Sequence, residues 1–130
     1  MIVLDTSVII AVLFEEPDAL AFVDKIKSAD ACSSSAATLF EVGIVLARQA
    51  GSTDDGAIQE FLASGSVQVI PFDAVQSAIA RETYRRFGQG SGHPARLNFG
   101  DCFAYALANA LDAPLLFKGD DFGHTDVRAA

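Results

Sequence analysis

Acidic side chains recur at points where a buried strand or a turn gives way to a helix. They are Asp5, Glu41, Asp101 and the adjacent pair Asp120 and Asp121. Two unit charges about 4 Å apart repel by about 4 kcal/mol at an effective dielectric constant near 20, so a cluster of such acids needs protons or a cation. Carboxylate oxygens favour Mg²⁺ or Mn²⁺ over Zn²⁺. An ion held in this way polarises phosphoryl oxygens and activates water, so the chemistry indicated is phosphodiester hydrolysis.

Each acid also has a purely structural interpretation. The spacings Thr38-x-x-Glu41 and Asn98-x-x-Asp101 fit capping boxes, in which the acid serves only the helix that carries it. The two consecutive aspartates suit a turn. For any one acid alone the structural interpretation is the better one, whereas the recurrence of the pattern favours a shared site.

The acids can meet only if the chain forms a suitable sheet. The apolar run before Asp5 predicts a strand that is buried on both faces of a parallel sheet. Further strands are expected at Ala31–Ser33, Val67–Ile70 and Leu115–Phe117, with helices between them. This alternation predicts one domain, residues 1–130, with a three-layer α/β/α fold and a mainly parallel central sheet. Strand carboxyl ends and helix amino ends share one rim of such a sheet, where the acids can converge.

The helices are placed by their periodic apolar residues and by their caps. The expected spans are Ser7–Phe14, Pro17–Lys27, Ala36–Gln49, Thr53–Ala63, Asp73–Phe87 and Phe99–Leu111. Pro17 suits a first helical turn, Gly51 ends the third helix, and Asp73 with Gln76 resembles a capping box. The glycine-rich segment Gly88–Arg96 is expected to be a mobile loop.

Composition limits the classes of protein to which the chain can belong. Of its 130 residues 51% are hydrophobic and the mean hydropathy is +0.31, so apolar surface is expected to meet a partner or a second copy. No apolar stretch reaches the roughly 18 residues of a membrane span, and no basic leader precedes the first strand. Cys32 and Cys102 show no metal-binding spacing, which indicates reduced core thiols in a cytoplasmic protein.

The net charge of −8 argues against non-specific binding to phosphates. Acidic residues dominate the early part of the chain, whereas five basic residues come later. They are Arg81, Arg85, Arg86, Arg96 and Lys118. These residues either form a local basic patch or are ordinary solvated residues on helix faces.

Four stretches together resemble the PIN-domain family. They are Asp5-Thr6-Ser7 after the first strand, Glu41 on an early helix, Asn98-Phe99-Gly100-Asp101-Cys102-Phe103 and Lys118-Gly119-Asp120-Asp121-Phe122. The closer resemblance is to VapC-type toxins of bacterial toxin–antitoxin pairs, and the closing Phe122-x-x-Thr125-Asp126-Val127 also fits that pattern. The resemblance covers essentially the whole chain, and its last two stretches are the most specific.

The resemblance implies a Mg²⁺-dependent endoribonuclease, in which Mn²⁺ can replace Mg²⁺. It also implies a homodimer that a VapB-like antitoxin holds inactive. By position, the catalytic acids that would bind the metal are Asp5, Glu41, Asp101 and one of Asp120 and Asp121. Asp121 is favoured as the fourth because the acid directly before the Phe is the more regular feature, and Asp120 would help to orient metal or water. Thr6 would support the site, and Asn98 would hold the turn that carries Asp101.

The same resemblance implies two binding surfaces. The candidates for holding the RNA backbone are Arg85, Arg86, Arg96 and Lys118. The Gly88–Arg96 loop, including His93, would clamp the substrate, although a solvated connector explains His93 more simply. An antitoxin tail would insert an apolar segment between the early helices and an arginine among the acids. The groove candidates, which ordinary core packing explains equally well, are Phe14, Leu20, Phe40 and Ile44.

Three other classes fit part of the pattern. A phosphoacceptor signalling domain has an Asp-rich pocket and a lysine in the place of Lys118, but it needs an acceptor Asp after a middle strand, where Gly51-Ser52-Thr53 follows a helix here. A metal-dependent phosphatase with a strand-end Asp nucleophile usually has a second acid two residues on, where Ser7 stands. In a non-catalytic interaction module the acids would only cap helices, and replacing Asp101 by Asn would change neither metal binding nor toxicity.

Overall fold

The structure is a computed structural model that describes residues 1–51 and 55–130. In chain order its elements are β1 (Ile2–Leu4), α1 (Thr6–Leu13), α2 (Ala19–Ser28), β2 (Cys32–Ser35), α3 (Ala36–Gln49), α4 (Gly56–Ser64), β3 (Val67–Ile70), α5 (Ala74–Phe87), α6 (Phe99–Ala110), β4 (Leu115–Leu116) and the 3₁₀ helix η1 (Asp121–His124). The four strands form a parallel sheet in the order β3-β2-β1-β4. The predicted parallel sheet is therefore confirmed.

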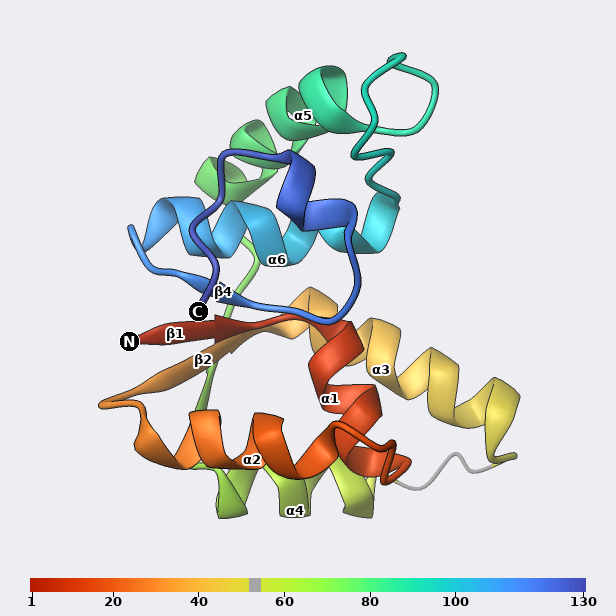
Figure 1. The fold of residues 1–130 in the computed structure, drawn as a ribbon, viewed down its shortest axis with the longest axis vertical. Helices are drawn as coiled ribbons and strands as arrows, with labels where there is room; N and C mark the ends of the chain where they lie inside the picture. Colours follow the sequence, from red (N-terminus) through yellow and green to blue (C-terminus); the bar gives the residue numbers. More distant parts are fainter. Residues whose placement is uncertain (52–54) are drawn as a thin grey trace.

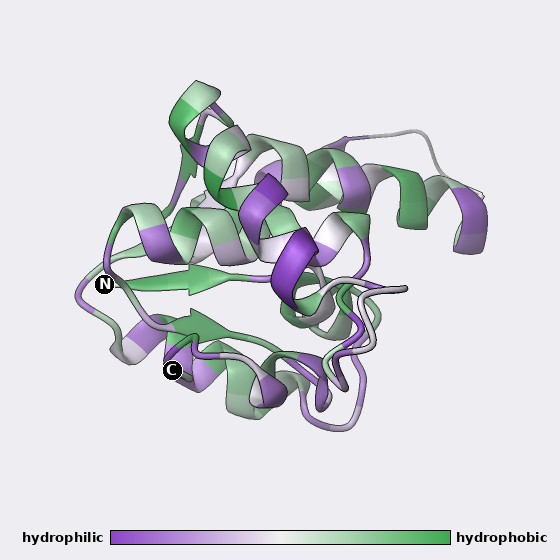
Figure 2. Cartoon of the chain, turned by 90° about the horizontal axis from the view of Figure 1, so that it is seen from above, coloured by the Kyte–Doolittle hydropathy of each residue, from purple (hydrophilic) through white to green (hydrophobic). Residues whose placement is uncertain are grey.

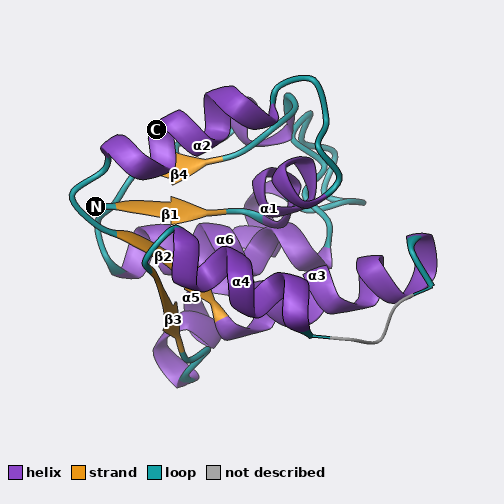
Figure 3. Cartoon of the chain, turned by 90° about the horizontal axis from the view of Figure 1, so that it is seen from below, coloured by secondary structure: helices purple, strands orange, loops and turns teal. Residues whose placement is uncertain are grey.

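Helices cover both faces of this sheet. In the view of Figure 1, α5 and α6 lie above the strands, and α2 and α4 lie below them. Figure 3 shows the molecule from below, with α4 on the near side and α6 behind it. The predicted three-layer α/β/α arrangement is confirmed.

The two faces of the sheet bury separate hydrophobic clusters, because consecutive strand residues point to opposite sides. Val3 and Leu115 belong to the cluster under α5 and α6, whereas Leu4 and Leu116 belong to the cluster that α1 to α4 cover. All four side chains are at most 2% exposed. Strand β1, which starts at the N-terminus, is accordingly hydrophobic along its length, while the helices mix hydrophobic and hydrophilic residues (Figure 2). Burial on both faces explains why the central strands β1 and β4 are continuous apolar runs in the sequence.

Two helices begin directly where a strand ends. Asp5 is the only residue between β1 and α1, and it caps α1 by accepting a hydrogen bond from Ser7 N. Ser35 ends β2 and caps α3 by accepting from Ala37 N. These direct joins place the first turns of α1 and α3 at the carboxyl rim of the sheet.

Two predicted element boundaries in the outer parts of the chain are wrong. Pro17 does not lie in the first turn of a helix, because the chain turns through Glu15 with φ +52° and α2 begins only after Asp18. The last strand ends at Leu116 rather than Phe117, because its neighbour β1 ends at Leu4 and offers no further pairing.

Three further predictions concern the ends of α3, α4 and α5. Gly51, with φ +65°, follows the end of α3 as expected. The predicted cap Thr53 lies outside the described residues, and α4 begins at Gly56. Asp73 accepts from Gln76 N, but the Gln76 side chain donates to Pro71 O, so only half of the predicted capping box forms.

The glycine-rich loop before α6 is tied at its base. Leu97 N donates to Phe87 O at 2.8 Å, and Gln89 N donates to Leu97 O at 2.9 Å. The His93 ring packs edge-on against Phe87 with the ring centres 4.9 Å apart. These contacts hold the segment that leads into Asn98 and α6 against the core.

The remaining general predictions concern the thiols and the membrane. Cys32 and Cys102 are both buried and free. Among the described helices, none is long and apolar enough to span a membrane.

Candidate active site

Asp5 stands at the carboxyl end of β1 and is almost entirely buried, with 4% of its surface exposed. Its Oδ2 atom accepts two hydrogen bonds from Ser7, from the backbone N at 3.0 Å and from Oγ at 2.6 Å. Burial raises the pKa of Asp5 to about 6, the Ser7 hydrogen bonds oppose this, and the charge of Glu41 raises it further. A buried carboxylate that is held in place but not neutralised favours a cation.

Glu41 reaches the same place from α3. Thr6 Oγ1, in the first turn of α1, donates a hydrogen bond to Glu41 Oε1. The carboxylate lies against Gly100 in the first turn of α6, where an added Cβ would stand 1.7 Å from Glu41 Oε2. The amino ends of α1 and α6 therefore meet at this carboxylate, which suits the partial positive charge of helix amino ends.

The predicted capping box between Thr38 and Glu41 is wrong. Ser35 caps α3, and Thr38 lies fully buried inside the helix. Because β2 runs directly into α3, the helix begins three residues earlier than that box requires. The Glu41 carboxylate is therefore not engaged by the start of its own helix and is available to face α6.

Asp101 combines a cap with a perturbed carboxyl group. Its Oδ2 accepts from Asn98 N and its N donates to Asn98 Oδ1, both at 2.9 Å, so this predicted capping box is confirmed. Burial nevertheless raises the pKa of Asp101 to about 7, and the charges of Asp5, Asp121 and Glu41 add to this against the Asn98 bond. Asp5, Glu41 and Asp121 therefore lie near enough to Asp101, on the same side of the sheet, for their charges to act on it.

The same effect bears on the choice of the fourth acid. The charge of Asp121 contributes to the raised pKa of Asp101. Asp120 precedes η1 as its capping residue, and both aspartates are exposed. The arrangement favours Asp121 as the fourth acid, with Asp120 beside it at the start of η1.

The four acids offer only oxygen donors, which suits Mg²⁺ or Mn²⁺. Glu41 Oε2 and Asp101 Oδ1 accept no hydrogen bond from any residue that the structure describes, so they are available to a cation. Among the described residues, however, no three acidic, histidine or cysteine side chains already have the spacing of a formed metal centre. The residues still fit a divalent cation in kind, because all their free donors are carboxylate oxygens and such an ion would offset their mutual repulsion.

Most of the basic candidates for RNA contact are held in ion pairs. The pairs are Arg85 with Glu82, Arg86 with Asp126, and Lys118 with Glu16 and Asp18, at N···O distances between 2.6 and 3.2 Å. Arg96 is exposed, stands two residues before Asn98 and forms no ion pair with a described residue. Of the four, Arg96 is therefore the cation most available to a phosphate near Asp101.

Sequence reasoning missed two residues of this site. Ser7 orients Asp5 through two hydrogen bonds, and Gly100 makes room for Glu41. A signal was present for each. A hydroxyl two residues after a capping Asp is a usual turn partner, and glycine in a helix costs roughly 0.5–1 kcal/mol relative to alanine, so it calls for a packing reason.

Comparisons with known proteins agree with this fold and site. The PIN domain family model matches residues 2–128. Ribonuclease VapC28 of Mycobacterium tuberculosis is 48% identical over 128 residues, which cover 98% of this chain and 96% of that protein. Ribonuclease VapC of Mycolicibacterium smegmatis is 41% identical over 127 residues, with 98% of each chain covered.

Solved structures give the same fold. VapC20 of Mycobacterium tuberculosis, described as a sarcin–ricin loop cleaving toxin, has a TM-score of 0.77 at 20% identity and covers 100% of this chain and 98% of its own. VapBC2 of Rickettsia felis, bound to a promoter DNA fragment, has a TM-score of 0.76 at 17% identity, with 99% and 96% covered.

A four-stranded parallel sheet with acidic residues at its carboxyl rim places the chain among small α/β domains with an acidic candidate site. The chain belongs to the PIN-domain family, and within it to the VapC proteins.

Proposed function

We propose that this protein is a divalent-metal-dependent endoribonuclease, with Mg²⁺ as its cofactor, that acts as the toxin of a toxin–antitoxin pair. The observation that carries the proposal is that Glu41 bonds to Thr6, next to Asp5, and lies against Gly100, next to Asp101, so that three acids from α1, α3 and α6 meet at one rim of the sheet. Relatives that are 38–48% identical are named ribonucleases, which supports RNA as the substrate. A phosphoacceptor domain is not favoured, because the middle strand β2 ends in Ser35 rather than in an acceptor Asp.

The chain's own residues have distinct roles in this proposal. The acids that would hold the ion are Asp5, Glu41, Asp101 and Asp121. Bound Mg²⁺ would supply charge stabilisation at the scissile phosphate and an activated water. Ser7 orients Asp5, Thr6 orients Glu41, and Asn98 fixes Asp101. Because burial raises the pKa of Asp101 to about 7, a cation bound there would displace a proton near neutral pH.

The direct test is cleavage of a mixed RNA pool that contains tRNA and ribosomal RNA. Cleavage is expected with Mg²⁺ or Mn²⁺ and is lost when EDTA removes the ion. Because the net charge is −8, binding to bulk RNA is expected to be weak and to fall steeply with salt. Cleavage that persists in EDTA would contradict the metal-based proposal. If the pool contains no target, mapping new RNA 5′ ends in cells that express the protein extends the same test.

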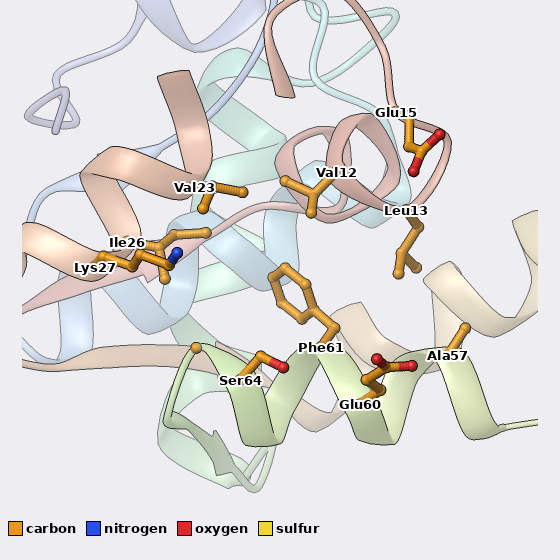
Figure 4. A pocket seen from close by; sticks show the side chains of 11 residues that line it. Val12, Leu13, Glu15, Val23, Ile26, Lys27, Ala57, Glu60, Phe61 and Ser64 are labelled. Atoms are coloured by element: carbon orange, nitrogen blue, oxygen red, sulfur yellow. The ribbon is translucent and has the colours of Figure 1, made fainter. Parts of the chain in front are cut away.

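A VapB-like antitoxin is the proposed partner. A solved structure with the same fold is a toxin–antitoxin complex from Klebsiella pneumoniae, with a TM-score of 0.73 at 14% identity. An open cavity of about 340 Å³ lies between α1, α2 and α4 (Figure 4). Val12, Val23 and Phe61 point into it, and charged side chains including Glu60 and Lys27 stand at its edge. An apolar antitoxin segment with polar flanks fits such a cavity.

This cavity is not the groove that the sequence suggested. Phe14, Leu20, Phe40 and Ile44 are exposed, but none of them lines it. We expect Val23→Asp to weaken binding of the cognate antitoxin at least tenfold, because the charge would be buried in an apolar contact. Leu20→Asp, on the same helix but outside the cavity, is the matched control and should bind as wild type. Antitoxin binding is measured by calorimetry. If Leu20→Asp weakens it and Val23→Asp does not, the antitoxin binds at the groove predicted from the sequence and not in this cavity.

A homodimer remains part of the proposal. A second open cavity, of about 520 Å³, is lined mainly by apolar and aromatic side chains of α5 and α6, with Phe72, Phe99 and Phe103 in edge-to-face contact. Phe99 is 77% exposed, and Phe40 on α3 is 72% exposed. An exposed aromatic surface of this kind is a natural contact for a second copy.

A further inference from the structure

We propose that Lys118 is a positioning residue of the acidic site: with Glu16 and Asp18 it forms an ion-pair strut that holds the loop carrying Asp121. The inference rests on the metal site of the proposed function and assigns to that site three residues outside the acid cluster. We call Lys118, Glu16 and Asp18 the strut.

Lys118 is fixed at both its backbone and its side chain. Its backbone N donates to Ser7 Oγ at 2.9 Å, and the same Oγ donates to Asp5 Oδ2 at 2.6 Å. Its Nζ lies 2.7 Å from Glu16 Oε1 and 3.1 Å from Asp18 Oδ1. One residue thus links the loop after β4 to Asp5 and to the connection between α1 and α2.

The far end of the strut is itself held in place. Glu16 N donates to Ala11 O at 2.9 Å, and Ala19 N donates to Glu16 O at 2.9 Å. These bonds fix the backbone on both sides of Pro17 against α1 and α2. The two carboxylates therefore form a defined anchor for the lysine.

The loop that the strut holds is supported after Asp121 by η1 and by the buried Phe122, whereas the strut supports the part before Asp121. Phe117 and Phe122 anchor its two ends through a ring contact with centres 5.2 Å apart. Between them the chain turns at Gly119, with φ +98°, and Asp121 is exposed. Repulsion from the other acids acts against an inward position of Asp121, so a fixed backbone at Lys118 would help to keep it within reach of a shared cation.

The alternative role of Lys118 is contact with an RNA phosphate. Its Nζ already has two carboxylate partners, which a phosphate would have to displace. The geometry therefore favours the strut over direct RNA binding, and the two roles make opposite predictions for metal binding.

The test measures Mn²⁺ affinity of the purified full chain without RNA, by calorimetry or by electron paramagnetic resonance. Removing a positive charge beside an acidic site should by itself tighten cation binding. The strut predicts the opposite sign: Lys118→Met weakens Mn²⁺ binding on the order of tenfold, as expected for loss of a group that orients metal ligands. Lys118→Arg, which keeps charge and reach, should restore most of the affinity. Unchanged or tighter binding by Lys118→Met would overturn the inference.

Two further variants separate the strut from a general effect of lysine removal and from RNA contact. Lys25→Met is the matched control, because Lys25 also makes a long-range bond, to Ala130 O at 2.8 Å, and it should bind Mn²⁺ as wild type. The double variant Glu16→Gln with Asp18→Asn should weaken Mn²⁺ binding, and adding Lys118→Met should weaken it no further. If the double variant instead binds RNA more tightly with unchanged Mn²⁺ affinity, Lys118 is an RNA contact and the strut is refuted. Failure of the wild type to bind Mn²⁺ would refute the proposed function itself.

Discussion

Asp101→Asn is expected to abolish metal-dependent RNA cleavage while leaving the fold intact. The amide can still accept from Asn98 N, so the cap of α6 survives. What disappears is one negative charge of the acid cluster and one oxygen ligand. We expect cleavage to fall by about a thousandfold, the scale on which loss of one charge-stabilising group acts in an enzyme site. The measurement is cleavage of the same RNA pool by both proteins at equal Mg²⁺.

The same substitution should stabilise the metal-free protein at alkaline pH. The folded-state pKa of Asp101 is about 7, above its ordinary value of 3.8, so the folded state holds the proton more tightly than the unfolded state. The resulting stability is complete below about pH 4 and is lost as pH rises through 7. At pH 8 the wild type carries a charged, crowded carboxylate that the Asn variant lacks. We expect the variant to melt several degrees higher there.

Thermal melting between pH 5 and 8, without metal, checks this sign. The advantage of Asp101→Asn should shrink as pH falls, and added Mg²⁺ should stabilise the wild type more than the variant. Equal melting temperatures at pH 8 would show that Asp101 is not crowded by the other acids. Equal RNA cleavage by both proteins would remove Asp101 from the site and leave the interaction-module alternative standing.

The sheet and the positions of the acids were predictable because they depend on local patterns. A continuous apolar run ending at Asp5 indicates a buried parallel strand, and its end locates the rim. Asn98 and Asp101 are three residues apart, so the sequence alone predicts the capping box that they form. Local patterns of this kind also mislead: Thr38 and Glu41 have the same spacing, but the helix begins at Ala36 because β2 runs straight into it.

The long-range contacts around the candidate site could not be predicted, because they join residues far apart in the chain. Lys118 contacts Glu16 and Asp18, which lie about a hundred positions earlier in the chain. The periodic patterns that predict helices and strands carry no information about such a pairing. The contact between Glu41 and Gly100 is of the same kind. The charge of Lys118 alone suggested a role in RNA binding, whereas the structure shows where that charge is already engaged.

Gly100→Ala is expected to remove Glu41 from the site without unfolding the protein. The added methyl group would stand 1.7 Å from Glu41 Oε2 and 2.4 Å from its carboxyl carbon, so both cannot remain. The nearest atoms belong to the end of a flexible side chain, and the carboxylate therefore swings away and loses its bond with Thr6. Alanine also favours a helix by up to about 1 kcal/mol over glycine, which offsets part of the disturbance. We expect Mn²⁺ affinity to fall by more than tenfold and RNA cleavage by about a hundredfold.

Gly43→Ala is the matched control, because it adds the same methyl group to a helix that carries Glu41. Among the described residues its Cβ would meet just Ile58 Cδ1, at an ordinary distance of 4.0 Å, so Mn²⁺ binding and cleavage should equal those of the wild type. Gly100→Ala with wild-type Mn²⁺ affinity would show that Glu41 does not bind the ion. If Gly100→Ala loses Mn²⁺ affinity and Gly43→Ala does not, the absence of a side chain at Gly100 is what allows Glu41 to reach the site.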